Sequence, residues 1–212
     1  MNFFNEKEFL ELQDIYNPDA FIKKVNIKYM RSSFFNKMKK SVKRDRRGEV
    51  VFCVIRPNGK IVTITCKEYP EGIFRIPTGG ICHNEDIIEA VYRETSEELG
   101  VEVIIDKFLG VLKIEFELLE NNQSTIDSFM FYSYLFILTE TGGRLLIDAS
   151  DDEISEVREV DLEELRAITG SLLKISGRWN DWGKFRFETC NAIVQYFTEH
   201  CQKGDNYANT TI

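Results

Sequence analysis

Two kinds of hydrophobic spacing divide this chain near residue 48. Before that point, apolar side chains recur at about every fourth residue, which predicts a helical segment over residues 1–47. After it, apolar runs of strand length begin: residues 50–55 and 61–66 are predicted strands, joined by a hairpin turn at Pro57-Asn58-Gly59. The apolar positions of the first pattern are Phe21, Val25, Met30, Phe34, Met38 and Val42.

The second part of the chain alternates predicted strands and helices. Helices are expected from Asn84 as N-cap to Leu99-Gly100, from Asp161 as N-cap, and over 184–201. Mixed strands with helices segregated in sequence indicate an α/β sandwich with a mixed sheet, preceded by a helical N-terminal extension. The further predicted strands are 74–76, 101–105, 112–118, 129–138 and 156–160.

Length and charge limit the organisation and the partners. The 212 residues, 43% hydrophobic and 29% charged, suit one globular domain over 48–202, with a polar tail over 203–212 expected to be disordered. The net charge of −8 argues against general adhesion to nucleic acid or to an anionic membrane. Residues 1–48 nevertheless carry a net charge of +6. The basic run at 37–47 is either a solvated face or a surface that binds phosphate or a partner.

Cysteine usage and the chain start predict a cytoplasmic protein. The five cysteines are odd in number and form no CxxC pair, so neither a disulfide framework nor a zinc site is indicated. The first ten residues lack a signal-peptide core, and the longest apolar run, at 129–138, is too short for a membrane helix.

One helix face gathers more negative charge than stability favours. Glu94, Glu97 and Glu98 stand at i, i+3 and i+4 near the C-terminal end of the predicted helix. Like charges at this spacing repel, and the helix dipole disfavours them at that end. Divalent cations would relieve the repulsion, and carboxylate oxygens suit Mg²⁺ or Mn²⁺. A solvated acidic face explains the spacing alone equally well.

The residues around these glutamates resemble the Nudix box, G-x5-E-x7-R-E-U-x-E-E-x-G-U, where U is a bulky aliphatic residue. Gly79 opens the pattern, Glu85 follows, and Arg93-Glu94 comes after seven more residues. All the charged and glycine positions are present, and the one departure is Thr95 at an aliphatic position. The segment Phe74–Gly80 and the segment Glu156–Leu165 also look like parts of this family, so the resemblance covers about residues 48–200.

The resemblance implies a Nudix-type α/β/α sandwich and a Mg²⁺-dependent (or Mn²⁺-dependent) hydrolase that cleaves a pyrophosphate bond in a nucleoside diphosphate linked to another group. By position, Glu94, Glu97 and Glu98 would bind metal, helped by the Gly79 carbonyl. Arg93 would pair with Glu85 and hold the loop against the helix. The general base would be a box glutamate, Glu153 or Glu156, although the last two also fit a solvated acidic turn. Arg75, Gly79 and Gly80 are candidates for substrate binding.

Other features leave alternatives open. Trp179 and Trp182 could stack a base, although aromatic residues before a final helix are more often core. His83 and Cys82 are weaker catalytic candidates. The sequence does not identify the phosphorylated small-molecule substrate, because the sub-signatures for ADP-ribose, diadenosine polyphosphate and coenzyme A hydrolases are missing. Competing hypotheses are a nucleotide-sensing Nudix module that signals through residues 1–47, and isomerase chemistry on the same fold. The apolar N-terminal extension is also compatible with a homodimer.

Overall fold

The computed structural model of the protein describes residues 3–30, 32–121, 124–145 and 154–201. Within these residues, seven strands form one mixed sheet in the order β1-β5-β6-β2-β3-β7, and β4 pairs with β2. The pairs β1–β5 and β2–β6 are parallel, and the other pairs are antiparallel. The strands are β1 (Phe21–Tyr29), β2 (Arg46–Ile55), β3 (Ile61–Thr65), β4 (Thr78–Cys82), β5 (Val101–Glu120), β6 (Ser124–Gly143) and β7 (Glu156–Val160).

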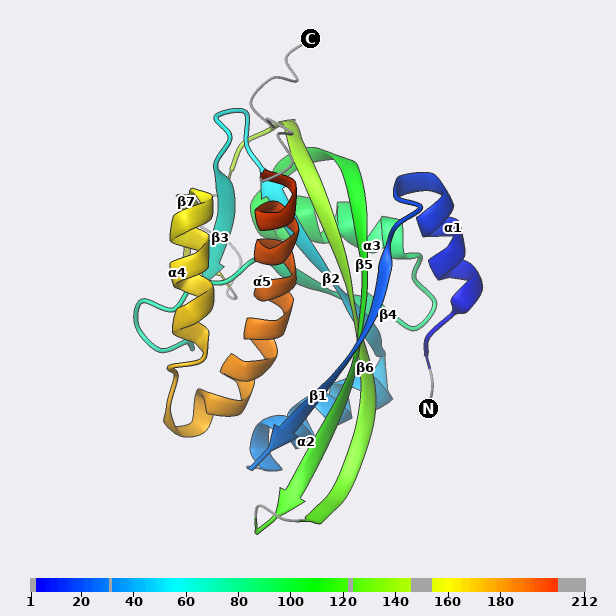
Figure 1. Ribbon diagram of the computed structural model, residues 1–212, viewed down its shortest axis with the longest axis vertical. Helices are drawn as coiled ribbons and strands as arrows, with labels where there is room; N and C mark the ends of the chain where they lie inside the picture. The colour runs from blue at the N-terminus through cyan, green and yellow to red at the C-terminus, as the bar shows by residue number, and fades with distance from the viewer. Residues whose placement is uncertain (1–2, 31, 122–123, 146–153, 202–212) are drawn as a thin grey trace.

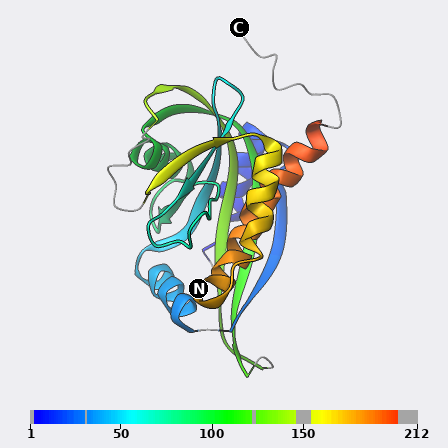
Figure 2. The same cartoon turned by 90° about the vertical axis from the view of Figure 1, so that its left-hand side faces the viewer.

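Helices cover both faces of this sheet, which confirms the expected α/β/α sandwich. Figure 2 shows α3 on one side of the strands and α4 and α5 on the other, and Figure 1 shows α4 and α5 side by side. The helices are α1 (Glu6–Tyr16), α2 (Ser32–Arg44), α3 (Ile87–Glu94), the π-helix η1 (Thr95–Leu99), α4 (Leu162–Leu172), the 3-10 turn η2 (Gly177–Trp179) and α5 (Asn180–Cys201).

Strand β2 shows how alternation builds two cores. Val51 and Cys53 pack with α2, α4 and α5 in one hydrophobic cluster. Val50, Phe52 and Val54 point the other way and pack with α1 and α3 in a second cluster. Because successive side chains of a strand face opposite sides, one buried strand supplies both clusters. Strand β6, which pairs with β2, and strand β5, which pairs with β6, are 20 residues long each.

The N-terminal segment departs from the predicted helix. Helices α1 and α2 are present, but residues 21–29 form β1, an edge strand that runs parallel to β5. The four-residue spacing was misleading here, because a period of two also fits: Val25, Ile27 and Tyr29 alternate with polar residues. The expected boundary between residues 47 and 48 falls inside β2.

Several other boundaries differ from expectation. The predicted strand over 74–76 is a single bridge between Arg75 and Ile64, and the strand lies at β4 instead. The predicted strands 101–105 and 112–118 are one continuous strand with bulges. The N-cap of α3 is Asp86 and not Asn84. Asp161 caps α4 as expected, with a complete capping box. The tail at 203–212 lies outside the described residues.

Helices long and apolar enough to cross a bilayer are absent from the described part of the chain.

Candidate active site

The site is built around two adjacent glycines of β4. A Cβ added at Gly79 would lie 2.0 Å from Cγ of Glu94, and one added at Gly80 would lie 3.4 Å from Nε of Arg46. Successive strand residues face opposite sides of a sheet, so Gly79 faces the α3 side and Gly80 the α5 side. The glycines therefore let a carboxylate and a guanidinium approach the same short stretch of backbone from opposite sides.

Helix α3 and the π turn after it position the box carboxylates, by which we mean Glu94, Glu97 and Glu98. Asp86 caps the helix by accepting from the backbone N–H groups of Ile88 and Glu89. The apolar face of α3, which includes Ala90 and Val91, is fully buried. Glu94 ends α3, whereas Glu97 and Glu98 lie on η1. Single π turns inside helices are frequent at functional sites, because they change the direction in which side chains point.

The end of this helix explains the one departure from the box pattern. Thr95 is fully buried, and its hydroxyl donates to the Val91 carbonyl at 2.6 Å. The hydroxyl is thus satisfied by the preceding turn, which a buried polar group requires. Gly100 ends the turn in the left-handed conformation, with φ 68°, as predicted from its place in the sequence.

Arg93 joins the glycine loop to the carboxylates. Its Nε and Nη2 donate to the Glu85 carboxylate at 2.7 and 3.1 Å, and Nη2 also donates to the Gly80 carbonyl at 2.9 Å. The ion pair between Arg93 and Glu85 that the resemblance implies is therefore present. Nη1 donates to Glu94 at 2.8 Å and to Glu97 at 3.0 Å. One guanidinium thus fixes the loop and two of the three carboxylates relative to each other.

Burial and neighbouring charges give the carboxyl groups different pKa values. Burial raises the pKa of Glu94, and the negative charge of Glu97 adds to that effect, although Arg93 opposes both. Burial also acts to raise the pKa of Glu85, but hydrogen bonds from Arg93 and from the Cys82 backbone outweigh it and lower the pKa. A cation bound at Glu94 would therefore offset the effect of burial on its charged form.

The donor set fits a hard divalent cation. The box carboxylates offer only oxygen ligands, as Mg²⁺ and Mn²⁺ prefer. Across the residues that the structure describes, however, no three His, Cys, Asp or Glu side chains converge enough to enclose a cation. This agrees with Mg²⁺ chemistry, in which a few carboxylates are completed by water and substrate phosphates. Metal binding would also compete with the hydrogen bonds from Arg93.

A second charged group lies on the α5 side of the sheet, and the sequence did not predict that its members lie together. We call it the arginine cluster: Arg46 and Arg186, which pair with Glu49, and Arg75, whose charge acts on Arg46. Glu49 is fully buried and accepts from Arg186 at 2.9 and 3.1 Å, from Arg46 at 3.1 Å and from Ser133 at 2.9 Å. Burial lowers the pKa of Arg46, helped by Arg186 and Arg75, while Glu49 and Glu94 oppose this. The cluster therefore holds an excess of positive charge near the box carboxylates.

Arg75 is more enclosed than a typical ligand-binding side chain. It is 6% exposed, and its guanidinium donates to the Tyr69 hydroxyl at 2.8 Å, the Ile76 carbonyl at 2.9 Å and the Thr78 hydroxyl at 3.1 Å. Although burial acts to lower its pKa, the neighbouring groups, Glu98 among them, raise it. These contacts fix the backbone that leads into Gly79; a direct role in substrate binding stays a prediction.

The two tryptophans form an aromatic cluster with Tyr69. The ring centroids lie 4.5 Å apart for Tyr69 and Trp182, 5.8 Å for Tyr69 and Trp179, and 5.3 Å for the two tryptophans. Trp182 is 3% exposed and belongs to the core, whereas Trp179 is partly buried at its edge. A stacking role for either ring is a prediction that these contacts do not test.

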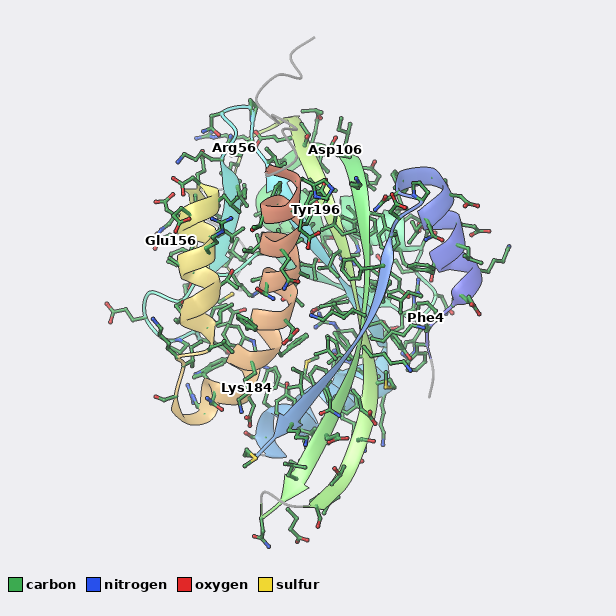
Figure 3. The ribbon with its side chains drawn as sticks, in the orientation of Figure 1. Phe4, Arg56, Asp106, Glu156, Lys184 and Tyr196 are labelled. Atoms are coloured by element: carbon green, nitrogen blue, oxygen red, sulfur yellow. The ribbon has the colours of Figure 1, made fainter. Side chains whose placement is uncertain are left out.

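The remaining candidates are Glu153, Glu156, His83 and Cys82. Glu156 is exposed at the start of β7 and pairs with Arg158 at 3.4 Å; Figure 3 shows it at the side of the molecule near α4. Glu153 lies outside the described residues. His83 is half-buried, and its ring stacks on Phe3 with centroids 4.7 Å apart. Cys82 is exposed, and burial together with Asp45 raises the pKa of its thiol, which opposes nucleophilic use.

Comparison with known proteins gives one sequence match and several structural likenesses. The sequence matches the NUDIX domain family over residues 45–204. A Nudix hydrolase from Nitrosomonas europaea is 15% identical, covering 73% of this chain and 90% of that chain with a TM-score of 0.48. An ADP-ribose pyrophosphatase from Streptococcus suis is 13% identical, covering 70% and 89% with a TM-score of 0.44. A UDP-X diphosphatase is also 13% identical, covering 78% and 72% with a TM-score of 0.46.

No curated protein matches the chain. All three structural likenesses fall below a TM-score of 0.5, so the assignment of a family depends on the sequence match, which spans well over half of the chain.

Proposed function

The chain belongs to the Nudix hydrolase family, and from this premise we propose that it is a Mg²⁺-dependent pyrophosphohydrolase acting on a nucleoside diphosphate linked to another group. The observation that supports this most is the pairing of Glu94 with Gly79 and of Arg46 with Gly80 on neighbouring residues of β4. Carboxylates for a cation and a guanidinium for phosphate oxygens thus flank one short piece of backbone.

The cation would be held by Glu94, Glu97 and Glu98 together with the Gly79 carbonyl. When bound, a divalent cation neutralises charge on phosphoryl oxygens and lowers the pKa of water. The protein positions its ligands through Arg93, which keeps Glu94 and Glu97 together and ties them to Glu85. Two of the three metal-binding side chains therefore share one anchor.

The arginine cluster would act on the phosphate groups of the substrate. Arg46 is partly exposed, with 26% of its side chain accessible, and it lies against Gly80. Its guanidinium would stabilise the negative charge that hydrolysis spreads over the phosphoryl oxygens. Glu49 pairs with Arg46 and also with Arg186, and both Glu49 and Arg186 are buried. The cluster would thus orient the diphosphate while the water attacks phosphorus on the carboxylate side.

Proton transfer from the attacking water is assigned to the box carboxylates as a group. Glu156 supports this role less well, because it is exposed and paired with Arg158. A general base needs hydrogen-bond reach of the proton that it removes, and the box carboxylates gather where the water would bind. Attack of water on one phosphorus breaks its bond to the bridging oxygen, and the other phosphate leaves with that oxygen and with the group attached to it.

Hydrolysis of the diphosphate bond leaves two phosphorylated products, so chromatographic separation of the products formed from a panel of diphosphate compounds with Mg²⁺ tests the proposal, with Glu98→Gln as the blank. The panel should contain nucleoside triphosphates, nucleotide sugars, ADP-ribose, dinucleoside polyphosphates and prenyl diphosphates. We expect turnover of at least one nucleotide-derived compound well above the blank. A folded protein that turns over none of them, yet binds a nucleotide, would instead support the nucleotide-sensing module.

A further inference from the structure

Helix α1 lies on the same face of the sheet as the helix that carries the box carboxylates. Phe9 and Leu12 of α1 are buried in the hydrophobic cluster that also contains Ile87, Ala90 and Val91 of α3. Figure 1 shows α1 at the edge of the sheet on the side of α3. Two helices that are separated by some 70 residues in sequence therefore share one core, and their relative position is fixed by packing.

A buried ion pair connects α1 to the loop of the Nudix box. Glu8 lies in the first turn of α1, where its charge suits the helix dipole, and Asn5 caps that turn. Arg47 donates to both Glu8 oxygens, at 2.8 and 2.6 Å, and to the backbone carbonyl of Glu85 at 2.7 Å. The Arg47 side chain is 9% exposed and that of Glu8 is 16% exposed. Such a shielded, two-pronged pair is much less mobile than a surface ion pair.

The contacts continue from this point to the box carboxylates. The side chain of Glu85 receives two hydrogen bonds from Arg93, and Arg93 in turn donates to Glu94 and Glu97. An unbroken series of hydrogen bonds thus runs from Glu8 through Arg47, Glu85 and Arg93 to the box carboxylates. The side chains of Glu8, Arg47, Glu85 and Glu94 are each 16% exposed or less, that of Arg93 is 35% exposed, and that of Glu97 is 56% exposed.

A second, separate contact holds the same loop. His83 stacks on Phe3, which precedes α1, with an interplanar angle of 23°. The other edge of the His83 ring lies 2.9 Å from the Val42 carbonyl, and its backbone N–H donates to Asp45 at 3.3 Å. The loop is therefore held from both sides by residues of the N-terminal 47.

We propose that the Glu8–Arg47 pair is a positioning device for the active site: it fixes the Glu85 backbone and, through Arg93, sets the placement of Glu94 and Glu97. This inference depends on the proposed hydrolase function, because the placement matters for turnover. The N-terminal segment then completes the catalytic domain, and any partner that displaced α1 would lower the rate without touching substrate.

The first test compares Glu8→Gln with Glu11→Gln. Both variants remove one carboxylate charge from α1. Glu11, however, is exposed, and it pairs with Lys7 of the same helix. We expect kcat of Glu8→Gln to fall about tenfold, as for other residues that act through a metal ligand, with KM within about twofold of wild type. Glu11→Gln should match wild type. A Glu8→Gln enzyme with wild-type kcat would overturn the inference.

Amide hydrogen exchange supplies a readout that needs no turnover. The Cys82 amide donates to Glu85 at 2.9 Å, and the Glu85 amide donates to the Cys82 carbonyl at 3.2 Å. Both should exchange faster in Glu8→Gln and not in Glu11→Gln. If exchange is unchanged, α1 does not hold the loop. If exchange accelerates while kcat is constant, the Glu8–Arg47 pair only stabilises the loop, and the positioning role is wrong.

A double variant separates this inference from a general loss of stability. If Glu8 and Arg47 act as one unit, Glu8→Gln combined with Arg47→Met should lose no more kcat than Arg47→Met alone. Losses that multiply would contradict a shared route. If wild type itself turns over none of the diphosphate compounds, the proposed function has failed. The exchange data alone then decide whether the Glu8–Arg47 pair holds the loop in place.

Discussion

Two groups of charged residues flank the glycines of β4, and they are built in opposite ways. The box carboxylates gather negative charge on the α3 side, and Glu97 leaves 56% of its side chain exposed. The arginine cluster gathers positive charge on the α5 side around Glu49, which is fully buried. The first group draws all its members from one stretch of five residues, from Glu94 to Glu98, whereas the second draws them from β2, α5 and the segment before β4.

The difference shows how one fold separates ligand binding from support. Buried charges must be paired, because an uncompensated ion in the interior costs several kcal/mol, so the arginine cluster is largely committed to the fold. Placing like charges close together costs less free energy when the carboxylates are partly exposed at the end of a helix, because water or a cation can reach them. We therefore expect changes in the arginine cluster to affect stability first, and changes in the carboxylates to affect turnover first.

The largest expected effect is on stability. Replacing Glu49 by glutamine should lower the free energy of unfolding by about 3–5 kcal/mol, because Arg46 and Arg186 would lose their buried counter-charge. Urea denaturation measures this. Glu102→Gln, at an exposed position of β5, should change the same quantity by less than about 0.5 kcal/mol.

A companion variant sharpens this prediction. The double variant Glu49→Leu with Arg186→Met should recover part of the lost stability, since no unpaired charge remains at that pair. If the Glu49→Gln variant is as stable as wild type, the arginine cluster does not stabilise the fold.

The next effect is on turnover. Glu98→Gln should lower kcat by about 100-fold or more, the size expected when an electrostatic group of the reaction is removed, while the melting temperature stays near that of wild type. Glu89→Gln, at an exposed position on α3, is the matched control and should keep full activity. Wild-type turnover by Glu98→Gln would refute the role assigned to the box carboxylates.

A smaller loss is expected where the two sides meet. Gly79→Ala adds a Cβ at 2.0 Å from Cγ of Glu94, so the carboxylate must move. Displacements of about 1 Å at a reacting site can lower rates by up to about 100-fold, and we expect a loss of about tenfold in kcat. Gly170→Ala on α4 meets nothing within 4 Å and should stabilise the protein by about 0.5–1 kcal/mol without changing kcat. Equal kinetics for both variants would contradict the close packing at Gly79.

The smallest effect is a pH dependence. The pKa of Glu85 in the folded protein is lower than its ordinary value of 4.5, chiefly because Arg93 hydrogen bonds outweigh burial. Its contribution to stability is therefore fully present above pH 4.5 and is lost as the pH falls through the folded-state pKa. The difference in unfolding free energy between wild type and Glu85→Gln should be largest near neutral pH and should shrink toward about pH 3. A difference that is constant across this range would contradict the ion pair.

The arrangement of the candidate site could be predicted from the sequence to the extent that its members are neighbours in the chain. Gly79, Glu85, Arg93 and the box carboxylates have fixed spacing, so a single helix and its preceding loop define their arrangement. The arginine cluster has no such spacing: Glu49 and Arg186 are 137 residues apart. Only the pairing of β2 with β4 and the packing of α5 bring them together. A charged residue among apolar strand positions, such as Glu49 before Val50 and Val51, was the available signal.

Strand β1 shows a different limit. Its apolar residues satisfy a helical and a strand period over part of their length, and local propensity does not choose between them. The choice comes from β5, which offers nine residue partners from Phe21–Gly110 to Tyr29–Leu118. Tertiary pairing therefore decides the structure of this segment, and the same pairing brings α1 to the Nudix box.

The central claim is that the box carboxylates bind the divalent cation that hydrolysis needs. Calorimetric titration of Mn²⁺ into wild type and into the variant with both Glu97→Gln and Glu98→Gln tests it without any substrate. We predict saturable binding to wild type that the double variant loses, together with loss of turnover when wild type is exhaustively chelated. Equal Mn²⁺ binding by the two proteins, or full activity after chelation, would contradict the account.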